Sequence, residues 1–257
     1  MGQKLFKSQA LLSNRPERSL IKLALGKVIA EDGFSVVKNV LDTNNIELLI
    51  QKIALAANSL FAKQRHKSIY AIRNALLIPE IRSLAYSQPI VSLANTVLNS
   101  QALPVKAFLF DKTPQANWKV PWHQDVTIAV KKYQPTPGFS NWSQKAGIIH
   151  VQPPVEILEN LLTLRIHLDN CDRHNEALKI IPGSHRYGKI AFTDIEGWKK
   201  STQVHTCEMQ AGDILILLPL LLHSSSISTN PTHRRVLHLE YSAINLPYGL
   251  EWCDGIN

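Results

Sequence analysis

The tripeptide His123-Gln124-Asp125 combines two side chains that bind metals, within the run Trp122-His123-Gln124-Asp125-Val126. We predict that this run is a β-strand, in which alternate side chains point to the same face. His123 and Asp125 would then present an imidazole and a carboxylate side by side. Two histidines and one carboxylate form the facial triad of non-haem Fe(II) oxygenases, which leaves positions open for substrate and oxygen. The tripeptide alone is too short to be specific, so a third ligand is needed.

His223 is the candidate for that third ligand among the ten histidines of the chain. It follows a predicted apolar strand, Asp213–Leu217, and precedes a cluster of three serines at 224–226. A polar cluster that opens from a buried strand needs partners, which a metal and an anionic cosubstrate would supply. The alternative is a core histidine that bonds a backbone carbonyl.

Arg234 and Arg235 begin an apolar strand eleven and twelve residues after His223. An arginine that enters a β core requires a carboxylate, because its planar fork binds one with two hydrogen bonds. Alternation puts Arg234, Val236, His238 and Glu240 on one face. That face is polar enough to line a liganded cavity, whereas the face of Arg235 is expected to pack against a neighbouring layer.

These residues, in this order, resemble the phytanoyl-CoA dioxygenase family of Fe(II)- and 2-oxoglutarate-dependent oxygenases. The resemblance rests on His123-Gln124-Asp125, on the segment Ile181-Pro182-Gly183-Ser184-His185-Arg186 and on His223 with Arg234. The opening segment 32–37 and the segment 110–125 are also similar to the family, so the resemblance spans nearly the whole chain. It implies a double-stranded β-helix (jelly roll), with Fe(II), 2-oxoglutarate and O2 as cofactor and cosubstrates.

The resemblance also implies roles for individual residues. His123, Asp125 and His223 match the iron ligands, and Arg234 matches the anchor for the distal carboxylate of 2-oxoglutarate. Ser225 matches a hydroxyl that assists this arginine. Gln124 matches a glutamine near the cosubstrate, and Arg165 lies at a strand position that faces the cosubstrate. The chain departs from the family at Asn175-Glu176, where Asn-Gly is usual. His167 and Asp169 share a strand face, but we interpret both as structural.

The implied reaction is hydroxylation of a small-molecule substrate, with release of succinate and CO2. The same iron chemistry can also end in desaturation, epimerisation or halogenation. Halogenation needs an open position where the carboxylate of Asp125 would bind, which favours hydroxylation. A different class of function is a non-enzymatic jelly-roll binding module with a basic surface, against which the intact triad argues.

The rest of the chain must position these residues. We expect a mainly β protein with flanking helices (α+β), as one domain over residues 1–257. Residues 1–98 are expected to be mostly helical support with one strand at 33–37. In that support, helices are predicted at 17–32, from a cap at Asp42 or Thr43 to about Ala62, at 68–87 and at 90–98. Residues 99–250 are expected to form the jelly-roll core, with strands at 105–111, 122–130, 162–169, 177–182, 204–208, 213–217 and 234–242.

One loop and one charge asymmetry stand out. The stretch 131–159 is rich in Pro, Gly and aromatic residues, and it is expected to be either a lid or a surface excursion packed by its own side chains. Residues 1–82 carry 13 Lys and Arg against 6 Asp and Glu. This basic excess is either a solvated face or a docking surface for an anionic partner or substrate.

The cellular setting follows from composition. The 257 residues contain no apolar run long enough to cross a bilayer, no secretory signal and three cysteines without paired spacing. We therefore expect a cytoplasmic protein whose partner is a small molecule and neither a membrane nor nucleic acid.

Overall fold

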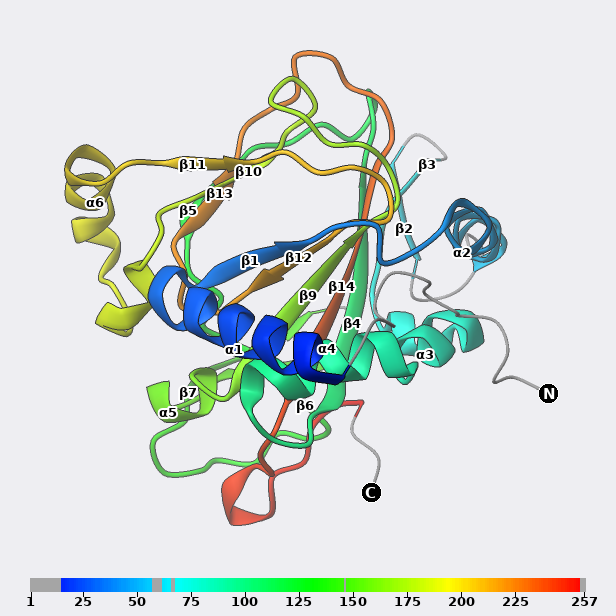
Figure 1. The fold of residues 1–257 in the computed structure, drawn as a ribbon. Coiled ribbons are helices and arrows are strands. Elements are labelled where there is room, and N and C mark those ends of the chain that lie inside the picture. The colour runs from blue at the N-terminus through cyan, green and yellow to red at the C-terminus, as the bar shows by residue number, and fades with distance from the viewer. Residues whose placement is uncertain (1–14, 57–61, 66–67, 146, 255–257) are drawn as a thin grey trace.

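Two antiparallel sheets face each other and enclose the centre of the molecule (Figure 1). The computed structural model describes residues 15–56, 62–65, 68–145 and 147–254. The larger sheet has the order β1-β12-β9-β14-β4-β3-β2. Its strands are β1 (Phe34–Val37), β12 (Ile214–Leu217), β9 (Leu161–His167), β14 (Arg234–Ser242), β4 (Leu103–Lys112), β3 (Ser68–Ile72) and β2 (Ala62–Arg65).

The smaller facing sheet has the order β11-β10-β13-β5, and a three-stranded sheet, β6-β8-β7, lies beside the pair. These strands are β11 (His205–Cys207), β10 (Leu178–Ile180), β13 (His223–Ser225), β5 (Val120–His123), β6 (Ile128–Val130), β8 (Ile148–Gln152) and β7 (Ser140–Lys145). The arrangement is a double-stranded β-helix with flanking helices, which confirms the predicted fold class.

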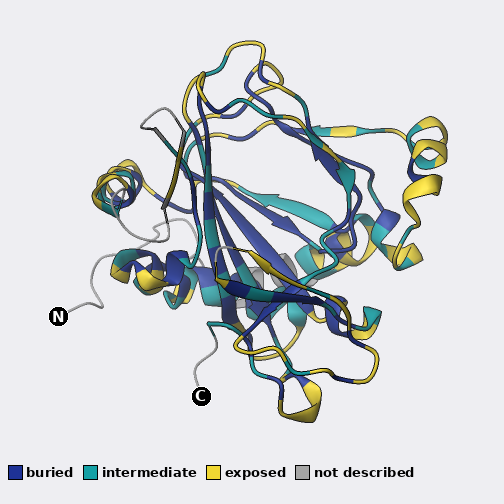
Figure 2. Cartoon of the chain, turned by 180° about the vertical axis from the view of Figure 1, so that it is seen from behind, coloured by how far each residue is buried: buried dark blue, intermediate teal, exposed yellow. Residues whose placement is uncertain are grey.

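Helices cover the outer face of the larger sheet. Apolar side chains from the helices, among them Leu49, Ile81 and Ile90, pack with Leu164 and Leu237 of the sheet in one buried cluster. Figure 2 shows the central strands of this sheet, β12, β9 and β14, buried along most of their length. The helices of this layer are α1 (Arg15–Asp32), α2 (Thr43–Leu55), α3 (Pro79–Ala85) and α4 (Gln88–Leu98). The shorter helices α5 (Val155–Leu158) and α6 (Ile195–Ser201) belong to other apolar clusters. Short 3-10 turns lie at Ala75–Leu77, Ser184–Tyr187, Phe192–Asp194 and Pro247–Gly249. Among the described residues, no helix has the length and apolar character that crossing a membrane requires.

Strand β14 runs through the middle of the larger sheet and follows the predicted alternation. Leu237, Leu239 and Tyr241 point into the helical layer, where the hydroxyl of Tyr241 donates to the carbonyl of Ala85 at 2.6 Å. The alternate residues point to the space between the two sheets. A single strand therefore separates the packed core of the protein from the wall of its cavity.

The N-terminal third differs from the predicted helical support. The helix at 17–32, the strand at 33–37 and the cap at Asp42, whose side chain accepts from the backbone N–H of Asn45 at 2.8 Å, are confirmed. The helix predicted over 68–87 is wrong at its start, because 68–72 is strand β3, which pairs with β2 and β4. The helix predicted to about Ala62 ends at Leu55, and residues 57–61 lie outside the described part. Three strands of this third thus extend the larger sheet, because β1 also pairs with β12.

Two predictions in the core are corrected as well. The strand predicted over 122–130 is two strands, β5 and β6, separated by residues 124–127. The stretch 131–159 is not one long loop, since β7 and β8 form a hairpin there and α5 follows. The sequence does not reveal the break at Gln124-Asp125. Apolar and polar residues alternate well enough from Trp122 to Val130 to predict one continuous strand.

Candidate active site

His123 and His223 lie directly opposite each other on neighbouring strands. His123 is the last residue of β5, His223 is the first of β13, and the two are register partners in the antiparallel pair. Their ring centroids are 4.3 Å apart. Asp125 lies two residues beyond the end of β5, where its backbone N–H donates to the carbonyl of Pro219 at 2.8 Å. The predicted juxtaposition of His123 and Asp125 is therefore correct, although Asp125 lies in the irregular segment that follows β5 and not within the strand.

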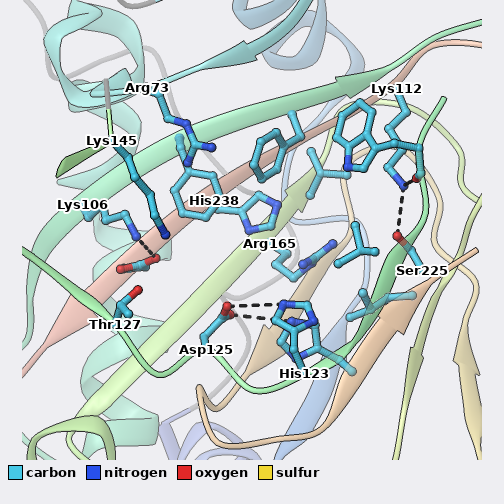
Figure 3. Close-up of a pocket in the computed structure, with 18 of the residues that line it drawn as sticks. Arg73, Lys106, Lys112, His123, Asp125, Thr127, Lys145, Arg165, Ser225 and His238 are labelled. Atoms are coloured by element: carbon cyan, nitrogen blue, oxygen red, sulfur yellow. Dashed lines mark hydrogen bonds and ion pairs between the residues drawn. The ribbon is translucent and has the colours of Figure 1, made fainter. Parts of the chain in front are cut away.

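Backbone carbonyls fix the orientation of both rings. Nδ1 of His123 donates to the carbonyl of Pro121, and Nδ1 of His223 to that of Leu221, each at 2.8 Å. A carbonyl can only accept, so each Nε2 is left as the free lone pair, as metal-bound histidines require. Nε2 of each ring lies 3.7 Å from a carboxylate oxygen of Asp125. The three ligand atoms lie within 4.8 Å of one another, close enough for one metal ion to reach all of them (Figure 3).

The protonation states also suit a cation. Burial lowers the pKa of His223 to about 4, so this ring is neutral near neutral pH. Burial acts to raise the pKa of Asp125, but the neighbouring His223 and His123 outweigh it and the pKa is lowered. Neutral imidazoles and an ionised carboxylate are the forms that bind a divalent metal.

The three residues open on a cavity of about 350 Å³ between the two sheets. Its walls come from β4, β9 and β14 of the larger sheet and from β5, β10 and β13 of the smaller one. Among the residues that the structure describes, six cationic side chains but only two carboxylates, Asp125 and Glu240, line it. The cations are Arg73, Lys106, Lys112, Lys145, Arg165 and Arg234.

Arg165 and Arg234 lie deep in this cavity, on the adjacent strands β9 and β14. Arg165 is 7% exposed and Arg234 is 5% exposed. Within the described part of the chain, Nε of each, and both ring nitrogens of His167 nearby on β9, are buried without a hydrogen-bond partner. Buried polar groups are nearly always satisfied, so the two guanidinium Nε–H groups at this end of the cavity are unmet donors that suit an anion.

Arg235 points the other way, as the alternation predicts. Its Nε and Nη2 donate to the two carboxylate oxygens of Asp169 at 2.8 and 2.6 Å. Asp169 is therefore engaged in a bidentate ion pair. This pairing agrees with the structural role predicted for Asp169.

Ser225 and Lys112 close the deep end of the cavity. Nζ of Lys112 donates to the hydroxyl of Ser225 at 3.0 Å and pairs with the carboxylate of Glu176. Glu176 occupies the position at which the family usually has glycine, and its backbone keeps the left-handed conformation with φ 63°. The segment is a turn, as the left-handed residue allows, and the carboxylate of Glu176 is buried behind the cavity.

Gln124 is the predicted cosubstrate residue that the structure does not bring to the cavity. Its Nε2 donates to the carbonyls of Gly188 at 2.8 Å and Leu220 at 2.6 Å, and its Oε1 accepts from the N–H of Ile190 at 2.8 Å. The amide instead binds two backbone segments, and these contacts hold the segment that carries Asp125.

A family model, described as phytanoyl-CoA dioxygenase, matches residues 29–236. The chain belongs to the phytanoyl-CoA dioxygenase family. Among curated proteins, none matches the sequence. Solved structures with a similar fold include three with TM-scores of 0.63 to 0.67.

One of these structures is AviO1 from Streptomyces viridochromogenes Tue57, 20% identical, covering 88% of this chain and 98% of its own, at TM-score 0.63. Another is SnoN, a non-heme alpha ketoglutarate dependent epimerase from nogalamycin biosynthesis, 19% identical over 93% of this chain and 90% of its own, at 0.67. A third is EctD from S. alaskensis with 2-oxoglutarate and 5-hydroxyectoine, 16% identical over 93% and 80%, at 0.66. At these identities the likeness concerns the fold.

Several cavity residues were not predicted from the sequence. Lys106, Phe108, Phe110 and Lys112 all point inward from β4. Their period-2 spacing is the signal that could have found them, but the apolar residues between them give the impression of a strand covered on both faces. Arg73 directly follows β3 and Lys145 ends β7, and neither strand was expected there.

Proposed function

We propose that this protein is an Fe(II)- and 2-oxoglutarate-dependent oxygenase that hydroxylates a small-molecule substrate. The observation that carries the proposal is the convergence of His123, Asp125 and His223 at one cavity, with both Nε2 atoms facing the carboxylate. The two imidazoles and one carboxylate fit the facial ligand set of non-haem iron. Membership of a dioxygenase family supports the same assignment.

Bound iron and 2-oxoglutarate would supply the oxidant: O2, 2-oxoglutarate and a substrate C–H yield succinate, CO2 and the hydroxylated product. The protein contributes binding, orientation and exclusion of water. His123, His223 and Asp125 would hold the metal on one side. The other side would stay open to the cavity.

Arg234 would bind the far carboxylate of the cosubstrate. Its guanidinium is buried, lies on the cavity wall and has an unpartnered Nε. Arg165, on the next strand, supplies a second buried guanidinium. Ser225 would contribute a hydroxyl, held in place by Lys112. These donors are fixed before the ligand arrives, so little reorganisation accompanies binding.

Asp125 supports oxygenation over halogenation. Its carboxylate would fill the metal position that a halide needs. The related structures include an alpha ketoglutarate dependent epimerase and a carbocyclase, so the product decides between outcomes that share one metal site.

The experiment has two stages. Candidate small molecules are screened for succinate release above the background of His223→Ala, with Fe(II), 2-oxoglutarate and O2 present. The product is then made under ¹⁸O2 in excess chloride and analysed by mass spectrometry. Hydroxylation adds one labelled oxygen. Loss of two hydrogens, an unchanged mass or a chlorine atom would indicate desaturation, epimerisation or halogenation instead. Wild-type protein that never exceeds the His223→Ala background, and binds no 2-oxoglutarate, would favour a binding module.

A further inference from the structure

The cavity has two chemically different ends on either side of the candidate metal site. Figure 3 shows Lys112 and Ser225 at one end, and the charged ends of Arg73, Lys106 and Lys145 gathered at the other. We call the second group the outer cationic end. It is not needed for the cosubstrate, because the deep end already provides Arg165 and Arg234.

Lys106 is neutralised within the outer cationic end. Its Nζ donates to the carboxylate of Glu240 at 2.8 Å, and it lies 4.8 Å from the ring centroid of Phe108. Arg73 and Lys145 are different. Across the described ranges of the chain, neither has a carboxylate within ion-pair distance. This end of the cavity therefore holds two cations that no ion pair neutralises.

Aromatic rings hold Arg73 in position. Its guanidinium carbon lies 5.1 Å from the ring centroid of Phe110 and 5.8 Å from that of Phe108. Its Nε is buried and has no hydrogen-bond partner within the described residues. Burying a guanidinium donor without a hydrogen-bond partner costs free energy, and a bound ligand that accepts this hydrogen bond would remove the cost. The fork is thus presented to the cavity before any ligand binds.

An apolar and aromatic wall connects this end with the metal site. Phe108 stacks on the ring of His238, with centroids 4.4 Å apart, and Phe110 meets the same ring edge-on at 5.7 Å. Burial lowers the pKa of His238 well below its usual value, so the ring is neutral. The wall therefore offers contact to an uncharged part of a ligand and adds no charge.

We propose that the substrate carries an oxyanion, a carboxylate or a phosphate, that Arg73 and Lys145 bind, on an apolar body that lies along Phe108 and Phe110. The proposal rests on the proposed function, because it assigns the substrate subsite of the same cavity. Arg73 supplies a fork that matches two oxygens, and Lys145, from the β7–β8 hairpin, supplies a point charge.

The test uses the protein loaded anaerobically with Fe(II) and saturating 2-oxoglutarate, so that the deep end is filled. Isothermal titration calorimetry compares phenyl phosphate, benzoate and the neutral benzyl alcohol. At least one anion should bind more tightly than benzyl alcohol, and the tighter of the two identifies the oxyanion. Arg73→Gln and Lys145→Gln should each weaken binding of that anion by about ten-fold or more, since one hydrogen bond to a charged group changes an affinity by about this factor.

Lys132→Gln is the matched control, because it removes the same charge from an exposed residue outside the cavity. It should leave the affinity unchanged. Lys145 is exposed, so Lys145→Gln should fold even if Arg73→Gln does not, and Arg73→Lys gives a second variant. Equal binding of benzyl alcohol and the anions, no binding of either anion, or unchanged affinity in Lys145→Gln and the Arg73 variants would overturn the proposal.

A separate measurement of the 2-oxoglutarate affinity distinguishes a failure of the proposed function from a failure of the substrate subsite. It should be the same in wild type, Arg73→Gln and Lys145→Gln. If wild type binds no 2-oxoglutarate, the proposed function has failed. If 2-oxoglutarate binds normally but the anions do not, only the substrate subsite has failed. A large loss of 2-oxoglutarate affinity in Arg73→Gln would assign that arginine to the cosubstrate and overturn the subsite.

Discussion

The guanidinium of Arg234 lies 3.5 Å from the carboxylate of Glu176, so the buried arginine has a counter-ion of its own. The same carboxylate pairs with Lys112 and accepts from the backbone N–H of Ser228 at 2.9 Å. Glu176 keeps a left-handed backbone despite its side chain. A glutamate at this strained position is explained by the charges that it compensates, because Lys112 and Arg234 would otherwise be buried without an anion.

Glu176→Gln should therefore lower the free energy of unfolding by about 3–5 kcal/mol, which is the usual cost of removing one partner of a buried ion pair. The glutamine keeps the backbone strain and the side-chain shape, so the change isolates the charge. Chemical denaturation measures the free energy of unfolding. Glu159→Gln, at an exposed residue, should have little effect. If Glu176→Gln is as stable as wild type, water or rearrangement of Lys112 compensates the charges instead.

Metal binding should depend on all three ligands together. Asp125→Ala and His223→Ala should each weaken Fe(II) binding by orders of magnitude, because each variant keeps only two of the three clustered ligands. Anaerobic calorimetry measures the affinity. His174→Ala is the control, since this histidine is exposed and only its backbone makes hydrogen bonds. Unchanged affinity in His223→Ala would assign the third ligand to another side chain.

Stability should fall in mild acid because buried histidines resist protonation. Burial lowers the pKa of His150 to about 4 in the folded protein, whereas the unfolded chain titrates near 6.5. Between these values the unfolded state binds more protons, so the stabilising contribution of neutral His150 is lost as pH falls from about 6.5 to 4. His150→Asn should flatten the pH dependence of the melting temperature in this window, relative to wild type. An identical dependence in both would place the acid sensitivity in other groups.

The sequence predicts the ligands better than the path of the chain between them. His123, Asp125 and His223 converge as expected, yet Asp125 leaves the sheet after His123. The course of the segment after β5 depends on Gln124, whose amide donates to the carbonyls of Gly188 and Leu220. Those partners are more than sixty residues away in sequence, so local alternation cannot reveal them.

The outer part of the cavity is harder to predict for the same reason. Arg73 reaches the cavity because residues 68–72 pair with β4, although their local pattern also fits a helix. Lys145 reaches it because 131–159 folds into a hairpin. Strand pairing over long sequence separations decides both positions, and propensity is too weak to anticipate it. By contrast, β14 lies at the centre of its sheet, and its alternation between core and cavity is plain in the sequence.

Arg234 and Arg235 provide the sharpest test of that alternation. Arg234→Gln removes a buried guanidinium that would face the cosubstrate carboxylate. The loss should cost about 2–5 kcal/mol of binding, which corresponds to roughly 30-fold to several thousand-fold weaker 2-oxoglutarate affinity. Fe(II) binding should be largely unchanged, because Arg234 is not among the clustered ligands. Calorimetric titration of 2-oxoglutarate into the Fe(II)-loaded protein measures the effect.

Arg235→Gln is the matched control one residue away. It breaks the bidentate pair with Asp169, so the free energy of unfolding should fall by about 1–3 kcal/mol while 2-oxoglutarate affinity stays near wild type. The two variants change the same residue type on the same strand and differ only in the face they present. A large cosubstrate defect in Arg235→Gln with normal binding in Arg234→Gln would mean that the cosubstrate is held from the opposite face of β14. A defect in neither would mean that Arg165 alone can anchor it, because the side chain of Arg165 lines the same cavity from the neighbouring strand.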